Sequence, residues 1–303
     1  MTRLLDAAQT AACLPYAALI AQIRALLADA SVRVPERLVQ ALPGGGSLFV
    51  MPALDRHIAI AKLITFTPAN AGTQRPAIQG DVMVFDVATG ERKLILDGPT
   101  VTARRTAAVS LLAAELLAPV REGPLLIVGA GVQGRAHLEA FAQGLPLAQV
   151  FISSRSAASA QALADYARTL GLRSSVVDNA DKAVTECPLI VTCTPASGVV
   201  LRALPRGDAF IAAVGAFTPA MVELGPELCR HCASRGRIVV DTPQALHEAG
   251  DLLQAGLDVS GFATLRDVVS GAVAVAGSGP VLFKSCGWAG WDLAAARTAM
   301  RSM

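Results

Sequence analysis

Residues 125–134 read LLIVGAGVQG, and this stretch decides how the rest of the chain is interpreted. Its first four residues are apolar and predict a short buried strand, and a helix pattern that ends at Gly144 follows. Gly129 permits a tight turn, Gly131 leaves room for a phosphate to approach the backbone, and Gly134 allows close packing of helix on strand. The free N–H groups at the start of the helix would face the anion. The stretch therefore predicts a dinucleotide-binding turn, whose contacts are expected at Gly129, Gly131, Val132, Gln133 and Gly134.

Beyond this turn, short apolar runs alternate with helix patterns over residues 119–283. The runs are 149–153, 189–193, 209–214 and 238–240. Ser156 is placed to cap the helix that follows the first of them. Short, mainly apolar runs of this kind are typical of a parallel sheet that is covered on both faces. We therefore predict an α/β protein in which residues 119–283 form a doubly wound Rossmann domain.

The remainder of the chain has a different pattern, in which helices and strands are mixed. Residues 15–30 predict an amphipathic helix, and residues 88–90 join two strands of a hairpin. The last helix pattern, residues 288–301, is expected to pack back on this part. At 303 residues the chain is about twice the usual size of one domain. We therefore predict a second, discontinuous α+β domain, formed by residues 1–118 and 284–303.

The choice of dinucleotide is read about twenty residues after the glycine turn, where an NAD-binding domain has a carboxylate for the ribose 2′-hydroxyl. This chain instead has Ser154, Arg155 and Ser156. The guanidinium can pair with a 2′-phosphate, and the serine hydroxyls can hydrogen-bond it. We therefore expect NADP(H), with NAD(H) the less favoured cofactor. The alternative is that Arg155 is a solvated residue at the start of the next helix.

Composition excludes several other classes of protein. The net charge is +2 and the basic residues are scattered, which argues against a nucleic-acid partner. Gly and Pro interrupt every apolar run, so no membrane span is expected, and the lack of a basic segment followed by an apolar one predicts a cytoplasmic protein. The six cysteines are dispersed, as expected of reduced thiols. Residues 229–232, Cys-Arg-His-Cys, lack a second pair of ligands, so we expect a helix face there and no metal site.

Several segments together resemble the ornithine cyclodeaminase and mu-crystallin family over nearly the whole chain. They are Met51-Pro52-Ala53, Lys62 with Pro68 and Asn70 after it, 86–90, 102–108 (TARRTAA), the glycine turn, Val214-Gly215 and 283–292 (FKSCGWAGWD). The resemblance implies a Rossmann domain joined to a discontinuous domain that binds substrate and forms a homodimer. It also implies a small amino or imino acid as substrate.

The resemblance places three cations around the substrate α-carboxylate, beside the nicotinamide. They are Arg37, Lys62 and Arg105, with Lys62 and Arg105 nearest the chemistry. Lys62 lies in an otherwise apolar strand, an unfavourable place for an ammonium unless it is paired. The alternative is that these are surface charges; Arg104, about 100° round the helix from Arg105, should point elsewhere. Further cofactor contacts implied by the resemblance are Thr106, Thr192, Val214 and Ser285.

One departure from the family pattern bears on the substrate. Ornithine cyclodeaminases have an Asp that handles the distal amino group, and Phe217 stands at that position here, where it cannot accept a hydrogen bond. We therefore expect Phe217 to form an apolar wall, and the reaction to be NADP(H)-dependent reduction of a cyclic ketimine, such as pyrroline- or piperideine-2-carboxylate, or oxidation of a small α-amino acid. Two alternatives stay open: NAD-dependent cyclodeamination of ornithine to proline, and a non-catalytic NADPH-binding protein of the crystallin kind.

Overall fold

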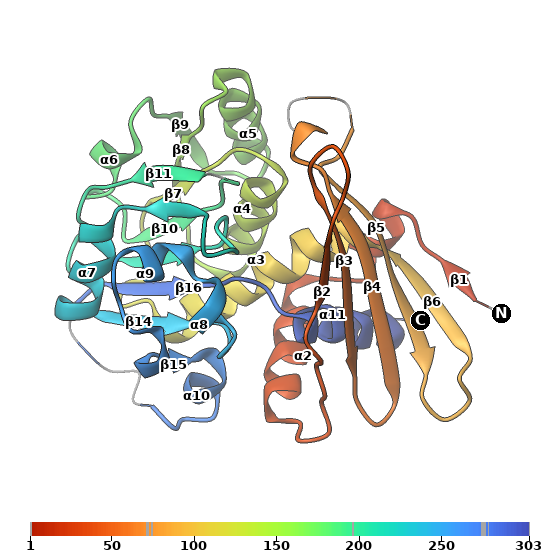
Figure 1. The fold of residues 1–303 in the computed structure, drawn as a ribbon. Coiled ribbons are helices and arrows are strands. Elements are labelled where there is room, and N and C mark those ends of the chain that lie inside the picture. The colour runs from red at the N-terminus through yellow and green to blue at the C-terminus, as the bar shows by residue number, and fades with distance from the viewer. Residues whose placement is uncertain are drawn as a thin grey trace. The chain divides into compact units, whose positions relative to one another are not determined.

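The computed structural model describes residues 2–70, 73, 75–195, 197–273, 277 and 279–302. The chain divides into two compact units: unit 1 comprises Met1–Arg105 with Trp288–Met303, and unit 2 comprises Thr106–Gly287. Helix α3 (Gly98–Leu117) begins in the first and continues into the second (Figure 1). It starts before Thr102, where its apolar pattern begins, because the Asp97 side chain accepts a hydrogen bond from the Thr100 N–H at 2.8 Å.

Unit 2 is built on one parallel sheet. Its eight strands lie in the order β15-β14-β16-β12-β10-β7-β8-β9. Their bounds are β7 Leu125–Val128, β8 Gln149–Ser153, β9 Arg173–Val176, β10 Leu189–Thr192, β12 Phe210–Ala213, β14 Arg237–Val240, β15 Ala263–Thr264 and β16 Val281–Lys284. The order reverses between β7 and β10, and ligands of such sheets bind at the carboxyl ends of the strands beside this reversal. The predicted doubly wound α/β fold is confirmed.

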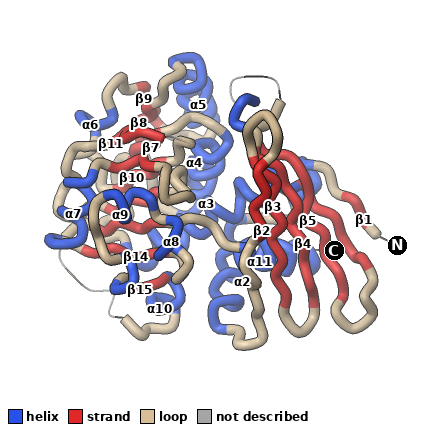
Figure 2. Tube along the Cα trace, in the orientation of Figure 1, coloured by secondary structure: helices blue, strands red, loops and turns tan. Residues whose placement is uncertain are grey.

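The helices of unit 2 surround this sheet (Figure 2). They are α4 Val132–Gly144, α5 Ala157–Thr169, α6 Ala180–Ala183, α7 Pro226–Arg235, α8 Ala245–Glu248, α9 Gly250–Gln254 and α10 Leu265–Val269, with a 3-10 turn at Val259–Gly261. A small pair of parallel strands, β11 (Ser197–Leu201) and β13 (Val222–Leu224), lies outside the main sheet. The central strands are buried along their whole length, which is why their sequences are apolar without alternation.

Unit 1 is built on a six-stranded, mostly antiparallel sheet in the order β1-β6-β5-β4-β3-β2. The strands are β1 Arg3–Leu4, β2 Leu38–Ala41, β3 Ser47–Leu54, β4 Ile58–Phe66, β5 Ile78–Asp86 and β6 Arg92–Asp97. Burial alternates along β3 to β6, so that one face of the sheet forms the core and the other is partly exposed. The expected hairpin at residues 88–90 joins β5 to β6.

Three helices and a 3-10 turn complete unit 1: α1 Ala7–Ala12, α2 Tyr16–Ala28, α11 Ala289–Arg301 and Pro68–Asn70. Helix α11 packs on β3, β4 and β5 and against α2, so the C-terminal segment covers the core face of the sheet. Arg297 on α11 fixes the helix in place, because its guanidinium forms ion pairs at 2.6 Å with both Asp29 and Asp55. Residues from the two ends of the chain therefore build one core.

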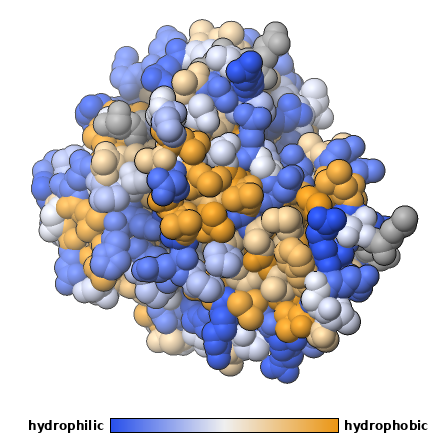
Figure 3. All heavy atoms as spheres, turned by 45° about the vertical axis from the view of Figure 1, so that its right-hand side comes forward, coloured by the Kyte–Doolittle hydropathy of each residue, from blue (hydrophilic) through white to orange (hydrophobic). Residues whose placement is uncertain are grey.

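The surface mixes polar and apolar side chains, and the face drawn in Figure 3 has several apolar patches. Among the described residues, no helix combines the length and the apolarity that crossing a membrane requires.

Candidate active site

The glycine turn of unit 2 has the geometry that a bound pyrophosphate needs. Gly129 has a φ of 116°, and a Cβ there would lie 2.9 Å from the Cys193 carbonyl oxygen. A Cβ on Gly134 would lie 2.0 Å from the Gly129 carbonyl oxygen, so both glycines are required by the turn itself. A Cβ on Gly131 would meet nothing within 4 Å. Gly131 thus faces open space at the start of α4, where Val132 is 70% exposed and the helix N–H groups begin.

Four strand ends are level at the carboxyl edge of the same sheet. The register pairs Val128 with Thr192, Thr192 with Ala213, and Ala213 with Lys284. The predicted cofactor residues Val214 and Ser285 directly follow two of these ends. The Thr192 hydroxyl is buried and has no hydrogen-bond partner among the described residues. An unpaired buried hydroxyl is unfavourable, so Thr192 fits a ligand that binds there.

The residues after β8 present no carboxylate. Ser154 is half-buried, and Arg155 and Ser156 are exposed. The Ser156 hydroxyl accepts a hydrogen bond from the Ser159 N–H at 3.2 Å and so caps α5, while the Ser154 hydroxyl accepts one from the Ser156 N–H at 3.3 Å. The two serines thus take part in the start of α5, whereas Arg155 is exposed to solvent directly before its capping residue.

Ser285 is held by a buried carboxylate that the sequence pattern did not reveal. Its hydroxyl donates to Asp241 Oδ2 at 2.8 Å, and the N–H groups of Cys286 and Gly287 donate to the same oxygen at 3.0 and 2.9 Å. Burial raises the pKa of Asp241, and these hydrogen bonds act in the opposite direction. The last predicted cofactor residue, Thr106, is buried on α3.

In unit 1, two of the three predicted cations meet at one carboxylate. Lys62 Nζ lies 3.0 Å from Asp292 Oδ1, and Arg105 Nε donates to the same oxygen at 3.2 Å. All three side chains are buried, with Asp292 fully so. Lys62 comes from the core face of β4, Arg105 from α3 and Asp292 from the first turn of α11. The second carboxylate oxygen, Oδ2, has no hydrogen-bond partner among the described residues.

This cluster has more positive than negative charge. Burial lowers the pKa of Lys62 to about 8, Asp292 opposes the shift, and Arg105 and, more weakly, Arg37 add to it. Arg37 is thus close enough to act on Lys62 electrostatically, and its guanidinium also lies 5.9 Å from the centre of the Phe49 ring. Arg104 points elsewhere, because its Nε donates to the Leu14 carbonyl at 2.8 Å and its guanidinium lies over the Tyr16 ring. The cluster fits an anionic ligand.

Phe217 follows β12 and is half-buried against the core of unit 2. Sequence reasoning did not single out Asp292, although it is the last residue of the quoted segment FKSCGWAGWD. It also passed over Glu223, Asp251 and Lys284, which are buried in unit 2. Asp292, Glu223 and Lys284 are charges among mainly apolar or small neighbours, which was the signal available in the sequence; Asp251, in HEAGDLLQ, gives no such signal.

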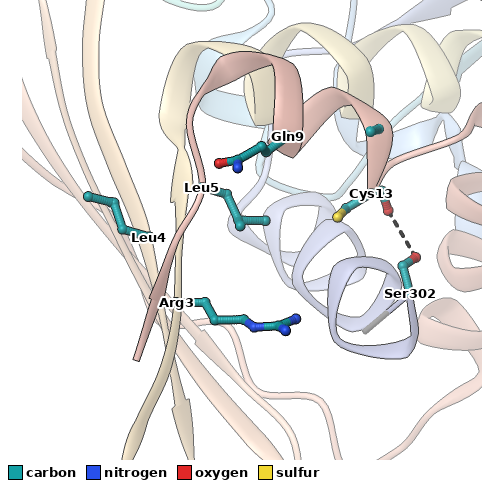
Figure 4. Close-up of a pocket in the computed structure, with 7 residues that line it drawn as sticks. Arg3, Leu4, Leu5, Gln9, Cys13 and Ser302 are labelled. Atoms are coloured by element: carbon teal, nitrogen blue, oxygen red, sulfur yellow. Dashed lines mark hydrogen bonds between the residues drawn. The ribbon is translucent and has the colours of Figure 1, made fainter. Parts of the chain in front are cut away.

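A surface hollow of about 510 Å³ lies elsewhere in unit 1, among β1, α1 and the end of α11 (Figure 4). Arg3 is the one charged residue that lines it, and the Ser302 hydroxyl donates to the Cys13 carbonyl at 3.3 Å. None of the predicted site residues lines it. Among the described residues, no three His, Cys, Asp or Glu side chains are grouped as metal ligands would be.

Comparison with known proteins gives one family. The model of the ornithine cyclodeaminase/mu-crystallin family matches residues 12–302. Delta(1)-pyrroline-2-carboxylate reductase 2 of Burkholderia ambifaria is 40% identical over 298 residues, covering 97% of this chain and 94% of the relative. Ketimine reductase mu-crystallin of Mus musculus is 36% identical over 274 residues, covering 89% and 85%.

Solved structures agree on the fold. The Thermococcus litoralis Delta(1)-pyrroline-2-carboxylate reductase, solved with NADH and L-proline, superposes with a TM-score of 0.86 at 23% identity, over 99% of this chain and 94% of the other. An archaeal alanine dehydrogenase dimer with bound NAD superposes with a TM-score of 0.89 at 23% identity, over 99% and 95%.

Proposed function

The chain belongs to the ornithine cyclodeaminase/mu-crystallin family, and we propose that it reduces cyclic ketimines such as pyrroline- or piperideine-2-carboxylate with NADPH. The match to the family model and the 40% identical relative confirm the family that the sequence resembles. Relatives with 40% and 36% identity are named for reduction of pyrroline-2-carboxylate and of ketimines, which supports this choice of reaction.

The observation that carries the proposal is the pair of buried cations on one carboxylate oxygen. Lys62 and Arg105 share Asp292, so the cluster keeps a net positive charge in a place where burying charge is costly. A substrate carboxylate would balance it, and an Arg binds a carboxylate through parallel N–H bonds. We assign Lys62, Arg105 and Arg37 to hold that carboxylate, and Asp292 to hold the first two in place.

Lys62 is also suited to supply the proton that the reduction requires. When a hydride adds to the C=N carbon, the π electrons move to nitrogen, and the nitrogen takes a proton. With a pKa of about 8, Lys62 is an ammonium at neutral pH and releases its proton more readily than an ordinary lysine does. We therefore assign proton donation to Lys62 Nζ, with Asp292 and Arg105 setting its pKa from either side.

The residues of unit 2 fit a nicotinamide dinucleotide. Gly131 leaves open space over the start of α4, and the buried Thr192 hydroxyl lacks a partner. When bound, the cofactor would supply the hydride. Contacts are proposed at Gly129, Gly131, Val132, Gln133, Gly134, Thr192, Val214 and Ser285, with Thr106 as a further candidate. Ser154, Arg155 and Ser156 favour the 2′-phosphate of NADP(H), because no carboxylate is there to repel it.

Phe217 favours an apolar ring over a substrate with a distal ammonium. A phenyl ring offers no acceptor for a charged amino group, whereas it packs well against ring methylenes. We therefore place reduction of a cyclic ketimine ahead of cyclodeamination of ornithine.

The test measures NADPH oxidation at 340 nm with pyrroline-2-carboxylate and with piperideine-2-carboxylate, and repeats both assays with NADH. A separate assay measures the formation of proline from ornithine. We expect turnover of the ketimines, faster with NADPH, and none of ornithine. Proline formation from ornithine would favour the cyclodeaminase, and binding of NADPH without any turnover would favour a non-catalytic protein.

A homodimer is part of the proposal. On the partly exposed face of the unit 1 sheet, one row of apolar residues crosses four strands, because the register joins Pro52 to Ala61, Ala61 to Met83, and Met83 to Ile95. Leu38 and Leu63 on the same face are 60% and 41% exposed. An apolar sheet face of this kind is typical of a protein interface, and we assign a second copy of the chain to it.

Light scattering of a Met83→Glu variant should show a monomer if this face forms the dimer.

A further inference from the structure

A single buried carboxylate in unit 2 binds two loops that leave the carboxyl edge of the sheet. Glu223, on β13, is fully buried. Its Oε1 accepts hydrogen bonds from the N–H and the hydroxyl of Thr194 at 2.6 and 3.0 Å. Its Oε2 accepts one from the Gly215 N–H at 2.6 Å. Thr194 follows β10 and Gly215 follows β12, so this one side chain joins the loops of two neighbouring strands.

Lys284 holds the second of these loops from another direction. At the end of β16, its ammonium donates to the Ala216 carbonyl at 2.6 Å and lies 2.7 Å from Asp251 Oδ2. Asp251 Oδ1 in turn accepts from the N–H groups of Glu223 and Leu224 at 2.6 and 2.9 Å. The Gly215–Ala216 backbone is therefore clamped at its N–H by an anion and at its C=O by a cation.

The loops at Thr194 and Gly215 are packed so closely that no side chain fits between them. A Cβ on Gly215 would lie 2.1 Å from the Thr194 carbonyl oxygen and 2.5 Å from Glu223 Oε1. Backbone, carboxylate and backbone are thus in direct contact, and a shift of either loop requires a shift of the other. Charge-assisted hydrogen bonds of this kind are stronger than neutral ones, and the carboxylates of Glu223 and Asp251 that accept them are buried.

The clamped backbone lies between two residues to which the proposed function gives a role. Val214 precedes it and is a proposed cofactor contact, and Phe217 follows it and is the proposed wall for the substrate ring. We propose that Glu223 and Lys284 are positioning residues that fix the Val214–Phe217 loop and so determine which ring size of ketimine the enzyme prefers. This inference rests on the proposed function, since it concerns the same substrate.

Glu223→Gln is the variant that tests it. Glutamine has the same shape but only one acceptor oxygen, and either orientation of its amide turns an NH₂ group towards a backbone N–H. One loop therefore loses its hydrogen bond while the volume of the side chain is kept. We expect the ratio of kcat/KM between pyrroline- and piperideine-2-carboxylate to change by at least about fivefold, and the Kd for NADPH, measured by fluorescence titration, to rise by about tenfold.

Leu228→Ala is the matched control. Leu228 is fully buried on α7, and its aliphatic side chain makes no hydrogen bond to either loop. It should lower the Tm through the cavity it leaves, with the ring-size ratio and the Kd unchanged. A merely structural network would make Glu223→Gln behave like this control.

The two proposals fail in different ways. If the wild type reduces the ketimines and Glu223→Gln keeps the wild-type ring-size ratio, positioning by Glu223 is overturned while the proposed function stands. If the wild type reduces neither ketimine, the proposed function fails and the claim about ring size falls with it.

Discussion

Lys62 of unit 1 and Lys284 of unit 2 are both buried strand residues, and their surroundings move their pKa values in opposite directions. Burial lowers the pKa of each ammonium. For Lys62 that effect prevails, because its one carboxylate, Asp292, is shared with Arg105, and the pKa falls to about 8. For Lys284, Asp251 and Glu223 outweigh burial, and the pKa rises above its ordinary value.

The surplus charge differs in sign: it is positive around Lys62, whereas around Lys284 it is negative and is stabilised by hydrogen bonds from backbone N–H groups and the Thr194 hydroxyl. The cluster around Lys62 has two cations on one carboxylate oxygen, so an added anion would stabilise it. The network around Lys284 has two carboxylates for one cation, and hydrogen bonds from neighbouring backbone groups occupy the oxygens of Glu223. We therefore expect loss of Lys62 to lower activity without destabilising the protein, and loss of Lys284 to destabilise the protein as well as to release the Val214–Phe217 loop.

The largest effect is expected for Lys62→Met, which keeps much of the volume and removes the charge. Loss of the proton donor and of one carboxylate contact should lower kcat/KM for ketimine reduction roughly 10²- to 10⁴-fold. The free energy of unfolding should stay the same or rise, because moving the pKa of Lys62 from 10.5 to about 8 corresponds to a cost on the order of 3 kcal/mol for the buried ammonium. That cost is fully present below pH 8 and is relieved above it. Steady-state kinetics and urea unfolding give both quantities.

Arg104→Ala is the control for Lys62→Met, since Arg104 is the neighbour of Arg105 that contacts Leu14 and Tyr16 instead of Asp292. Equal losses of activity in the two variants would show that Lys62 has no specific role in binding or protonating the substrate.

Lys284→Met should have the opposite profile in stability. It leaves Asp251 and Glu223 buried without their cation, and breaking a buried ion pair from one side costs about 3–5 kcal/mol. Because the pKa of Lys284 is raised, its stabilising effect is fully present at neutral pH and is lost only in strong alkali. Urea unfolding at pH 7 measures the change. If the Lys284→Met protein were as stable as the Lys62→Met protein, the claim that Lys284 stabilises the fold and Lys62 does not would be wrong.

The pH dependence of the reaction tests the environment of Lys62 directly. The ammonium form is required and predominates below the pKa, so kcat/KM for reduction should fall above pH 8 by about tenfold per pH unit. Lys62→Arg should lose this alkaline limb, because a guanidinium stays protonated. Since Asp292 raises the pKa of Lys62, Asp292→Asn should move the limb below pH 8. A limb that is unchanged in both variants would belong to another group.

Local pattern was enough to predict most of the fold. The glycine turn, the apolar strands and the doubly wound order follow from periodicity and from the residues that turns and helix ends require. A side chain outside the pattern sets the start of one helix: the apolar period begins at Thr102, but α3 starts four residues earlier, at Gly98, because Asp97 caps it. Burial on both faces explains why the central strands could be recognised without alternation.

The candidate site was harder to predict, because its charges are paired over long separations. Lys62 stands out as a charge in an apolar strand, but its partner Asp292 is 230 residues away and comes from the C-terminal helix. Glu223 and Lys284 give the same kind of signal, a charge in an apolar run, without naming a partner. A sequence pattern can thus show that a buried charge must be compensated, and only the fold shows by what. The roles of Arg37, Lys62, Arg105, Phe217 and the cofactor residues remain predictions.

The smallest effect is expected for a cation that is exposed. Arg155 lies at the surface after β8, so its attraction for a 2′-phosphate is weakened by water and salt. Arg155→Ala should raise the KM for NADPH roughly three- to tenfold, leave the KM for NADH unchanged, and lose its effect as ionic strength increases. Arg168→Ala, which removes another exposed cation from α5, should alter neither KM. If Arg155→Ala weakened NADH as much as NADPH, Arg155 would bind a group that both cofactors share, and the preference for NADPH would have to arise elsewhere. Lys62 is buried, so its contribution to substrate binding should change little as the salt concentration rises. Varying the ionic strength therefore distinguishes the exposed cation from the buried one.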